Sequence, residues 1–187
     1  LLLSPTLVRD RLRNTRPMQW ASRRGRSVLN TQMGAALFSA LVLTVVNVTV
    51  YAILFLVQGP LRFAACGLGG FLSPGSPWFD WTYGTYLLVL AGLILALSLG
   101  AAGLTAFLSQ YSGNYIAMLL KAVPLFVAVG VVLGSWLLDR PFTFRPLWDG
   151  YGPWVPKGAE AVAAAVLLAL GLGLCALACR RQRKREL

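Results

Sequence analysis

Few side chains in this sequence of 187 residues could do chemistry, and the cysteines are the first to consider. Cys175 and Cys179 are four residues apart, which is about one turn of a helix, and Cys66 is far from both. A zinc site usually needs four cysteine or histidine ligands. The sequence contains no histidine and no second cysteine pair, so it does not supply them. We therefore interpret the cysteines as apolar side chains and predict no metal and no cofactor.

The acidic residues do not form a catalytic pattern either. Both residues of a carboxylate pair would have to lie together, but all six acids fall in predicted loops, tails or span edges: Asp10, Asp80, Asp139, Asp149, Glu160 and Glu186. The phosphate-binding pattern GxxxxGK[ST] does not occur in the sequence. We expect that the chain is not an enzyme and that it does not itself bind ATP through such a loop.

The elements that must carry these residues are predicted from hydropathy. The chain is 57% hydrophobic and 12% charged, whereas a soluble domain has about 25% charged residues. Four apolar runs reach the roughly 20 residues that a membrane-spanning helix needs: 34–57, 85–109, 116–138 and 159–179. The predicted fold is an all-α, polytopic membrane protein with a four-span domain over 34–179, a basic segment at 1–33 and a basic tail at 180–187.

The basic residues predict how the spans are oriented. The formal net charge is +11, and 12 of the 17 basic residues lie in the two terminal segments, at Arg9, Arg11, Arg13, Arg16, Arg23, Arg24, Arg26, Arg180, Arg181, Arg183, Lys184 and Arg185. Basic residues accumulate on the cytoplasmic side of membrane proteins, so we predict that both termini are cytoplasmic. The charge then indicates contact with anionic membrane lipid in the plasma membrane and not with nucleic acid.

The two predicted outer loops, 58–84 and 139–158, are rich in proline, glycine and aromatic residues. Aromatic side chains favour the membrane interface, so one interpretation is a belt of aromatic residues on two surface loops. The alternative is that the second loop forms re-entrant or interfacial helices that close the outer end of a pathway, with Trp148 and Trp154 as pathway residues.

Polar residues are sparse inside the predicted spans. Asn47 lies near the middle of the first span, where its amide could bond to another helix. Lys121 lies close to the cytoplasmic end of the third span, so its ammonium could reach the interface, and Pro124 should kink that span. We favour structural roles for all three residues, with a gating or pathway role as the alternative.

Small residues at four-residue spacing predict faces for close helix packing. They occur at Gly92, Ala96 and Gly100 in the second span, at Gly130 and Gly134 in the third, and at Ala161, Ala165, Ala169 and Gly173 in the fourth.

The segment 7–33 combines basic and apolar residues, which favours either a helix on the membrane surface or a docking element for a cytoplasmic protein. Two motifs, one inside this segment and one much later in the chain, carry a family resemblance. The run SRRGRSVL at 22–29, which leads into the first span, resembles the segment before the third transmembrane helix of permeases of the type-2 ATP-binding-cassette (ABC) transporter family. The run LSQYSGNYIA at 108–117 is similar to a tight polar turn between two later spans of these permeases.

The resemblance implies the membrane subunit of an exporter with six spans, of which two would precede Leu1. ATP would be hydrolysed by a separate ATPase subunit, and a second permease subunit would complete the transporter. The resemblance also implies a cytoplasmic coupling helix within the segment 1–33, and the implied ATPase-docking residues are Arg9, Asp10, Arg11, Arg13, Asn14, Thr15 and Arg16. The competing class is a small four-span scaffold or assembly protein without transport activity.

Overall fold

The computed structural model of the protein describes residues 28–70, 76–133, 143–144 and 157–185. The predicted docking residues at 9–16, the basic residues Arg23, Arg24 and Arg26, and both loop tryptophans, Trp148 and Trp154, lie outside these ranges. Residues 134–138 of the predicted third span also lie outside them.

The described chain is built from four α-helices with short connecting elements. The helices are α3 (Val28–Val57), α4 (Tyr83–Gln110), α5 (Tyr115–Leu133) and α6 (Ala159–Arg185). Two 3-10 helices, η2 (Pro60–Phe63) and η3 (Leu68–Gly70), follow α3, and strands β1 (Ser76–Pro77) and β2 (Thr143–Phe144) form an antiparallel pair with Ser76 opposite Phe144. The described fold is therefore helical apart from this two-residue ladder.

Three of the helices are long and apolar enough to cross a membrane, over Asn30–Val57, Tyr83–Gln110 and Ala159–Arg181. They coincide with the predicted first, second and fourth spans. The predicted third span corresponds to α5, whose apolar stretch Tyr115–Val131 is shorter and runs through Pro124. This composition indicates a helical membrane protein.

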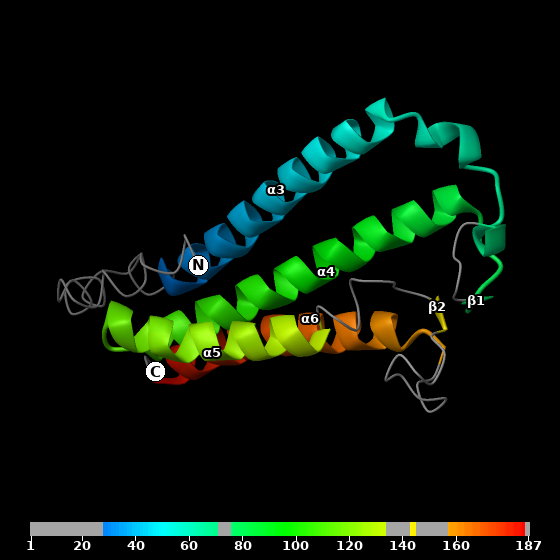
Figure 1. The fold of residues 1–187 in the computed structure, drawn as a ribbon. Helices are drawn as coiled ribbons and strands as arrows, with labels where there is room; N and C mark the ends of the chain where they lie inside the picture. Colours follow the sequence, from blue (N-terminus) through cyan, green and yellow to red (C-terminus); the bar gives the residue numbers. More distant parts are fainter. Residues whose placement is uncertain (1–27, 71–75, 134–142, 145–156, 186–187) are drawn as a thin grey trace.

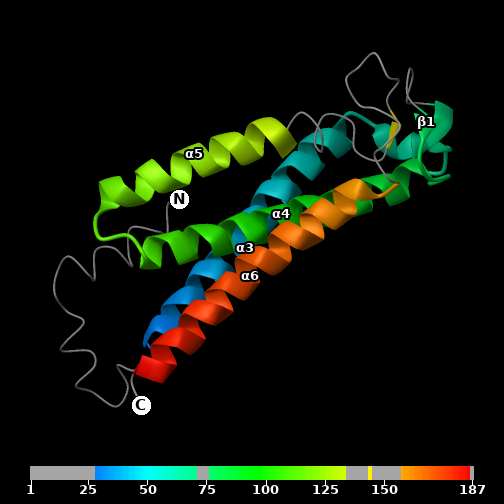
Figure 2. The same cartoon turned by 90° about the horizontal axis from the view of Figure 1, so that it is seen from below.

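The helices pack unequally (Figures 1 and 2). We call the end at which α6 carries Arg180 and Arg181 the basic end, and the end with η2, η3 and the two strands the loop end. Helices α4 and α6 both run from the loop end to the basic end and contact each other along their length, whereas α3 meets them near the basic end and diverges from α4 toward the loop end (Figure 1). Helix α5 makes few contacts with the others.

Glycines allow the close approach of α4 and α6. A Cβ placed on Gly103 would lie 2.7 Å from the backbone carbon and oxygen of Gly171, and one on Gly100 would lie 2.8 Å from the carbonyl oxygen of Leu167. Both distances are shorter than ordinary van der Waals contact, so only glycine fits at these two positions without movement of the helices. The pair α4–α6 is therefore a closely packed unit.

The small-residue face predicted for α6 was wrong. Ala161, Ala165 and Ala169 are exposed, and the residues turned toward α4 are instead Ala164, Gly171, Cys175 and Ala178, all of them buried. These residues follow a mixed spacing of three, four and seven, which keeps them on one helix face, whereas a strict four-residue spacing drifts around the helix. On α4 the prediction was correct at Gly100, but Gly92 is exposed with open space around its Cα.

Candidate functional site

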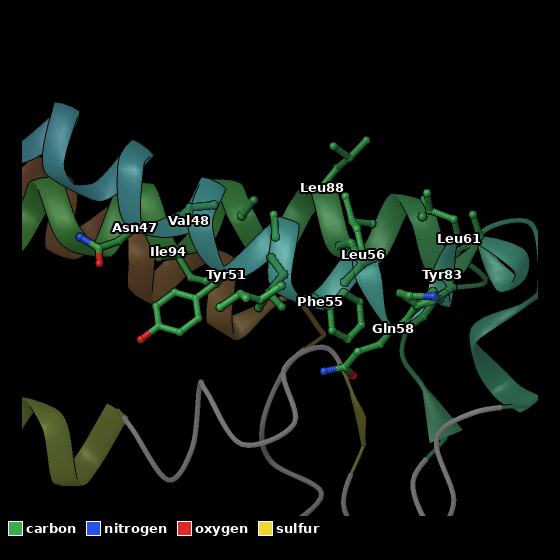
Figure 3. Close-up of a pocket in the computed structure, with 18 of the residues that line it drawn as sticks. Asn47, Val48, Tyr51, Phe55, Leu56, Gln58, Leu61, Tyr83, Leu88 and Ile94 are labelled. Carbon is green, nitrogen blue, oxygen red and sulfur yellow. The ribbon is translucent and has the colours of Figure 1, made fainter.

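The divergence of α3 from α4 leaves a cleft between them (Figure 3). It has a volume of about 1120 Å³ and is lined by residues within 43–58 in and just after α3, by residues within 60–64 in and just after η2, and by residues within 83–98 of α4. No described residue of α5 or α6 contributes to the lining. The cleft is thus a wedge with one wall on α3 and the other on α4, the helix that packs closely against α6.

The narrow end of the wedge is held by a cluster of buried side chains at the basic end. Met33 of α3 is 2% exposed and packs against Ala106 of α4 and against Cys175 and Ala178 of α6. These four residues are the only place in the described chain where α3, α4 and α6 share a buried core. The buried core that α3 shares with the pair is therefore confined to the basic end.

The wide end of the wedge is bounded by the connection between α3 and α4. Gly59 has a left-handed conformation with φ of 84°, which turns the chain into η2 at Pro60. The connection is then bonded to the start of α4, because the backbone N–H of Tyr83 donates to Cys66 at 3.0 Å and that of Gly84 donates to Ala64 at 3.0 Å. The connection is therefore bonded directly to the start of α4.

Polar side chains of α3 lie along the cleft at Thr44, Asn47 and Tyr51, and Gln58 lines it just after the helix ends. The spacing of three and four residues places Thr44, Asn47 and Tyr51 on one helix face, and this signal was available in the sequence, although only Asn47 was predicted as a candidate pathway residue. The Nδ2 of Asn47 donates to the carbonyl oxygen of Leu43 at 2.8 Å, and the hydroxyl of Thr44 donates to Ala40 at 2.8 Å. The expected bond from Asn47 to another helix is thus replaced by a bond within its own helix.

On α4, Tyr83 and Ser98 also line the cleft, and the rest of the lining is apolar and contains no charged residue. The described residues also contain no group of three or more histidine, cysteine, aspartate or glutamate side chains. The cleft can therefore bind an apolar or amphipathic chain or a neighbouring helix, but its lining offers no acid–base pair for catalysis.

Two other predicted residues lie away from the cleft. Lys121 and Pro124 are exposed on α5, so the structure does not bring them together with Asn47. Arg180 and Arg181 are both exposed at the basic end, and Arg183, Lys184 and Arg185 continue the helix there.

No protein-family model, no curated protein and no solved structure matches this chain. The class that the fold itself supports is a helical membrane protein, with an apolar wedge between α3 and a closely packed α4–α6 pair.

Proposed function

We propose that this chain is a membrane-spanning permease subunit of an ATP-driven ABC exporter. A separate ATPase subunit would supply the energy, and a second permease subunit would form the other half of the translocation pathway. The sequence motifs at 22–29 and 108–117 support this family, and the helical membrane fold is compatible with it.

The observation that carries the proposal is the wedge between α3 and the α4–α6 pair. A transporter that alternates between two access states needs two bodies that can change their angle, and the change is accommodated by a few residues at a hinge. Here α4 and α6 form one body through the Gly103–Gly171 contact, and α3 joins it through the small cluster around Met33. Closing the wedge would narrow a cleft that already has polar groups along one wall.

The topology in this proposal has four spans, with 116–138 as the third and with both termini on the cytoplasmic side of the plasma membrane. The basic end, with Arg180 and Arg181, would then face the cytoplasm and anionic lipid. The ATPase would dock on the segment 9–16, and the second outer loop would form re-entrant or interfacial helices.

The test is whether an ATPase activity copurifies with the chain. A tagged full chain is purified in mild detergent from the cells that normally make it, and vanadate-sensitive hydrolysis of Mg-ATP is measured in the eluate. The matched variant replaces Arg9, Arg11, Arg13 and Arg16 with alanine, and a control variant replaces the exposed Lys121 instead.

We expect activity with the natural chain and with the control, and loss of activity with the docking variant at equal membrane content. If no vanadate-sensitive activity accompanies the natural chain, the alternative of a four-span scaffold protein replaces the proposal. If the docking variant retains full activity, the docking assignment to 9–16 is wrong.

A further inference from the structure

Three sulfur-containing side chains lie in one packed cluster at the basic end of the bundle. The thiol of Cys179 donates to the thioether Sδ of Met33 at 3.6 Å, and the thiol of Cys175, one helical turn earlier on α6, donates to the carbonyl oxygen of Gly103 at 3.2 Å. Met33 is 2% exposed and Cys175 is 5% exposed, while Cys179 is half-buried. The three side chains belong to one packed cluster although Met33 is about 140 positions away in the sequence.

We propose that Met33, Cys175 and Cys179 form a binding site for Cu(I). Thiolate and thioether sulfurs are soft ligands that select Cu(I), and a site of two thiolates and one thioether suits a soft cation of low coordination number. A structural zinc site needs four ligands, usually cysteine or histidine, and no described cluster of histidine, cysteine, aspartate or glutamate supplies the remaining ones.

The observed separation of the sulfurs is close to what such a site requires. Two sulfurs bound to one metal at about 2.3 Å each, in a trigonal arrangement, are roughly 4 Å apart. The sulfurs of Cys179 and Met33 are 3.6 Å apart already. Residues four apart on a helix are neighbours on its surface, so rotation of the Cys175 side chain away from Gly103 can bring its sulfur to the same centre.

The reaction balances without an electron transfer. Two thiols release two protons to solvent, two copper–thiolate bonds form, a third bond is donated by the Sδ of Met33, and copper remains Cu(I). The site then carries one net negative charge at the membrane edge. Arg180 and Arg181 follow Cys179 directly and supply compensating positive charge, and the half-buried Cys179 provides the side from which the ion enters.

The test is a titration of the full chain, purified in dodecylmaltoside under anaerobic conditions with ascorbate, with Cu(I) against bicinchoninate as the competing coloured ligand. We expect one Cu(I) per chain. The double variant Cys175→Ala and Cys179→Ala should lose at least 100-fold in affinity and Met33→Leu roughly 10-fold or more, since even outer-shell partners are worth 10–100-fold. Cys66→Ala, which changes the exposed cysteine at the loop end, is the matched control and should bind as the natural chain does.

If the natural chain and the double variant bind Cu(I) with equal affinity, the proposed site is wrong. If Met33→Leu binds Cu(I) as tightly as the natural chain does, the assignment of Met33 as the third sulfur ligand is wrong. X-ray absorption of the natural chain with one Cu(I) gives a measurement that needs no variant. Three sulfur neighbours around copper support the proposal, whereas nitrogen or oxygen neighbours contradict it.

Discussion

The contact between Gly103 of α4 and Gly171 of α6 predicts that Gly103→Ala destabilises the protein. The new Cβ would lie 2.7 Å from the backbone of Gly171, whereas ordinary contact begins at 3.4 Å, so the helices must separate locally by about 0.7 Å. Backbone atoms cannot rotate out of the way as a side chain can. Overpacking of this kind typically costs about 1–3 kcal/mol, and the residues above and below the contact would lose van der Waals contact as well.

The assay is the free energy of unfolding in a titration of dodecylmaltoside micelles with SDS, followed by far-ultraviolet circular dichroism. Gly92→Ala is the matched control, because Gly92 is on the same helix but has nothing within 4 Å of its Cβ position. Both variants gain the same helix propensity, so their difference reports the contact alone. We expect Gly103→Ala to be less stable than Gly92→Ala by about 1–3 kcal/mol. A difference below about 0.5 kcal/mol, the scale of an ordinary surface substitution, would refute the close α4–α6 packing.

Three further outcomes are expected. Gly59→Ala should lower the free energy of unfolding by about 1 kcal/mol in the same SDS titration, because Gly59 has φ of 84°. Gly113→Ala is the control and should have no effect, because Gly113 has open space around it and no positive φ. Equal unfolding free energies of the two variants would contradict the turn geometry. Asn47→Leu should change the unfolding free energy by less than about 0.6 kcal/mol, which is the average for an interhelical hydrogen bond in a membrane protein. The reason is that the amide of Asn47 donates within α3, to Leu43. A larger loss would mean that Asn47 contacts another helix. Glutamine at all 12 basic positions of the two terminal segments should yield two orientations, seen as protease access to a C-terminal tag from both sides of the membrane. A single unchanged orientation would argue against the topology.

Hydropathy predicted the helices because composition alone determines which segments are stable in a membrane. The predicted runs at 34–57, 85–109 and 159–179 fall inside α3, α4 and α6. The helices are longer at one or both ends, since polar residues such as Thr82, which accepts a bond from the backbone N–H of Thr85, can begin a helix outside the apolar run.

The packing was harder to predict. Many positions of α6 are alanine or glycine, so a four-residue pattern occurs by chance on several faces, and the contact with Gly103 at Gly171 depends on where α4 lies. The cleft depends on the angle between α3 and α4, which no local pattern encodes. The sulfur cluster likewise depends on tertiary packing, because Met33 is distant in sequence from Cys175 and Cys179.

In the proposed exporter, ATP changes the angle between α3 and the α4–α6 pair, and the distance across the wedge measures this change most directly. Spin labels are attached at Tyr51→Cys on α3 and Leu88→Cys on α4, both exposed in the cleft lining, with the three natural cysteines replaced by alanine. The control pair is Gly92→Cys and Gly173→Cys, at open positions on α4 and α6. Double electron–electron resonance in isolated membranes should show the cleft distance shifting by more than about 2 Å when Mg-ATP and vanadate are added, with the control distance unchanged. A cleft distance that does not respond to nucleotide would contradict the exporter proposal.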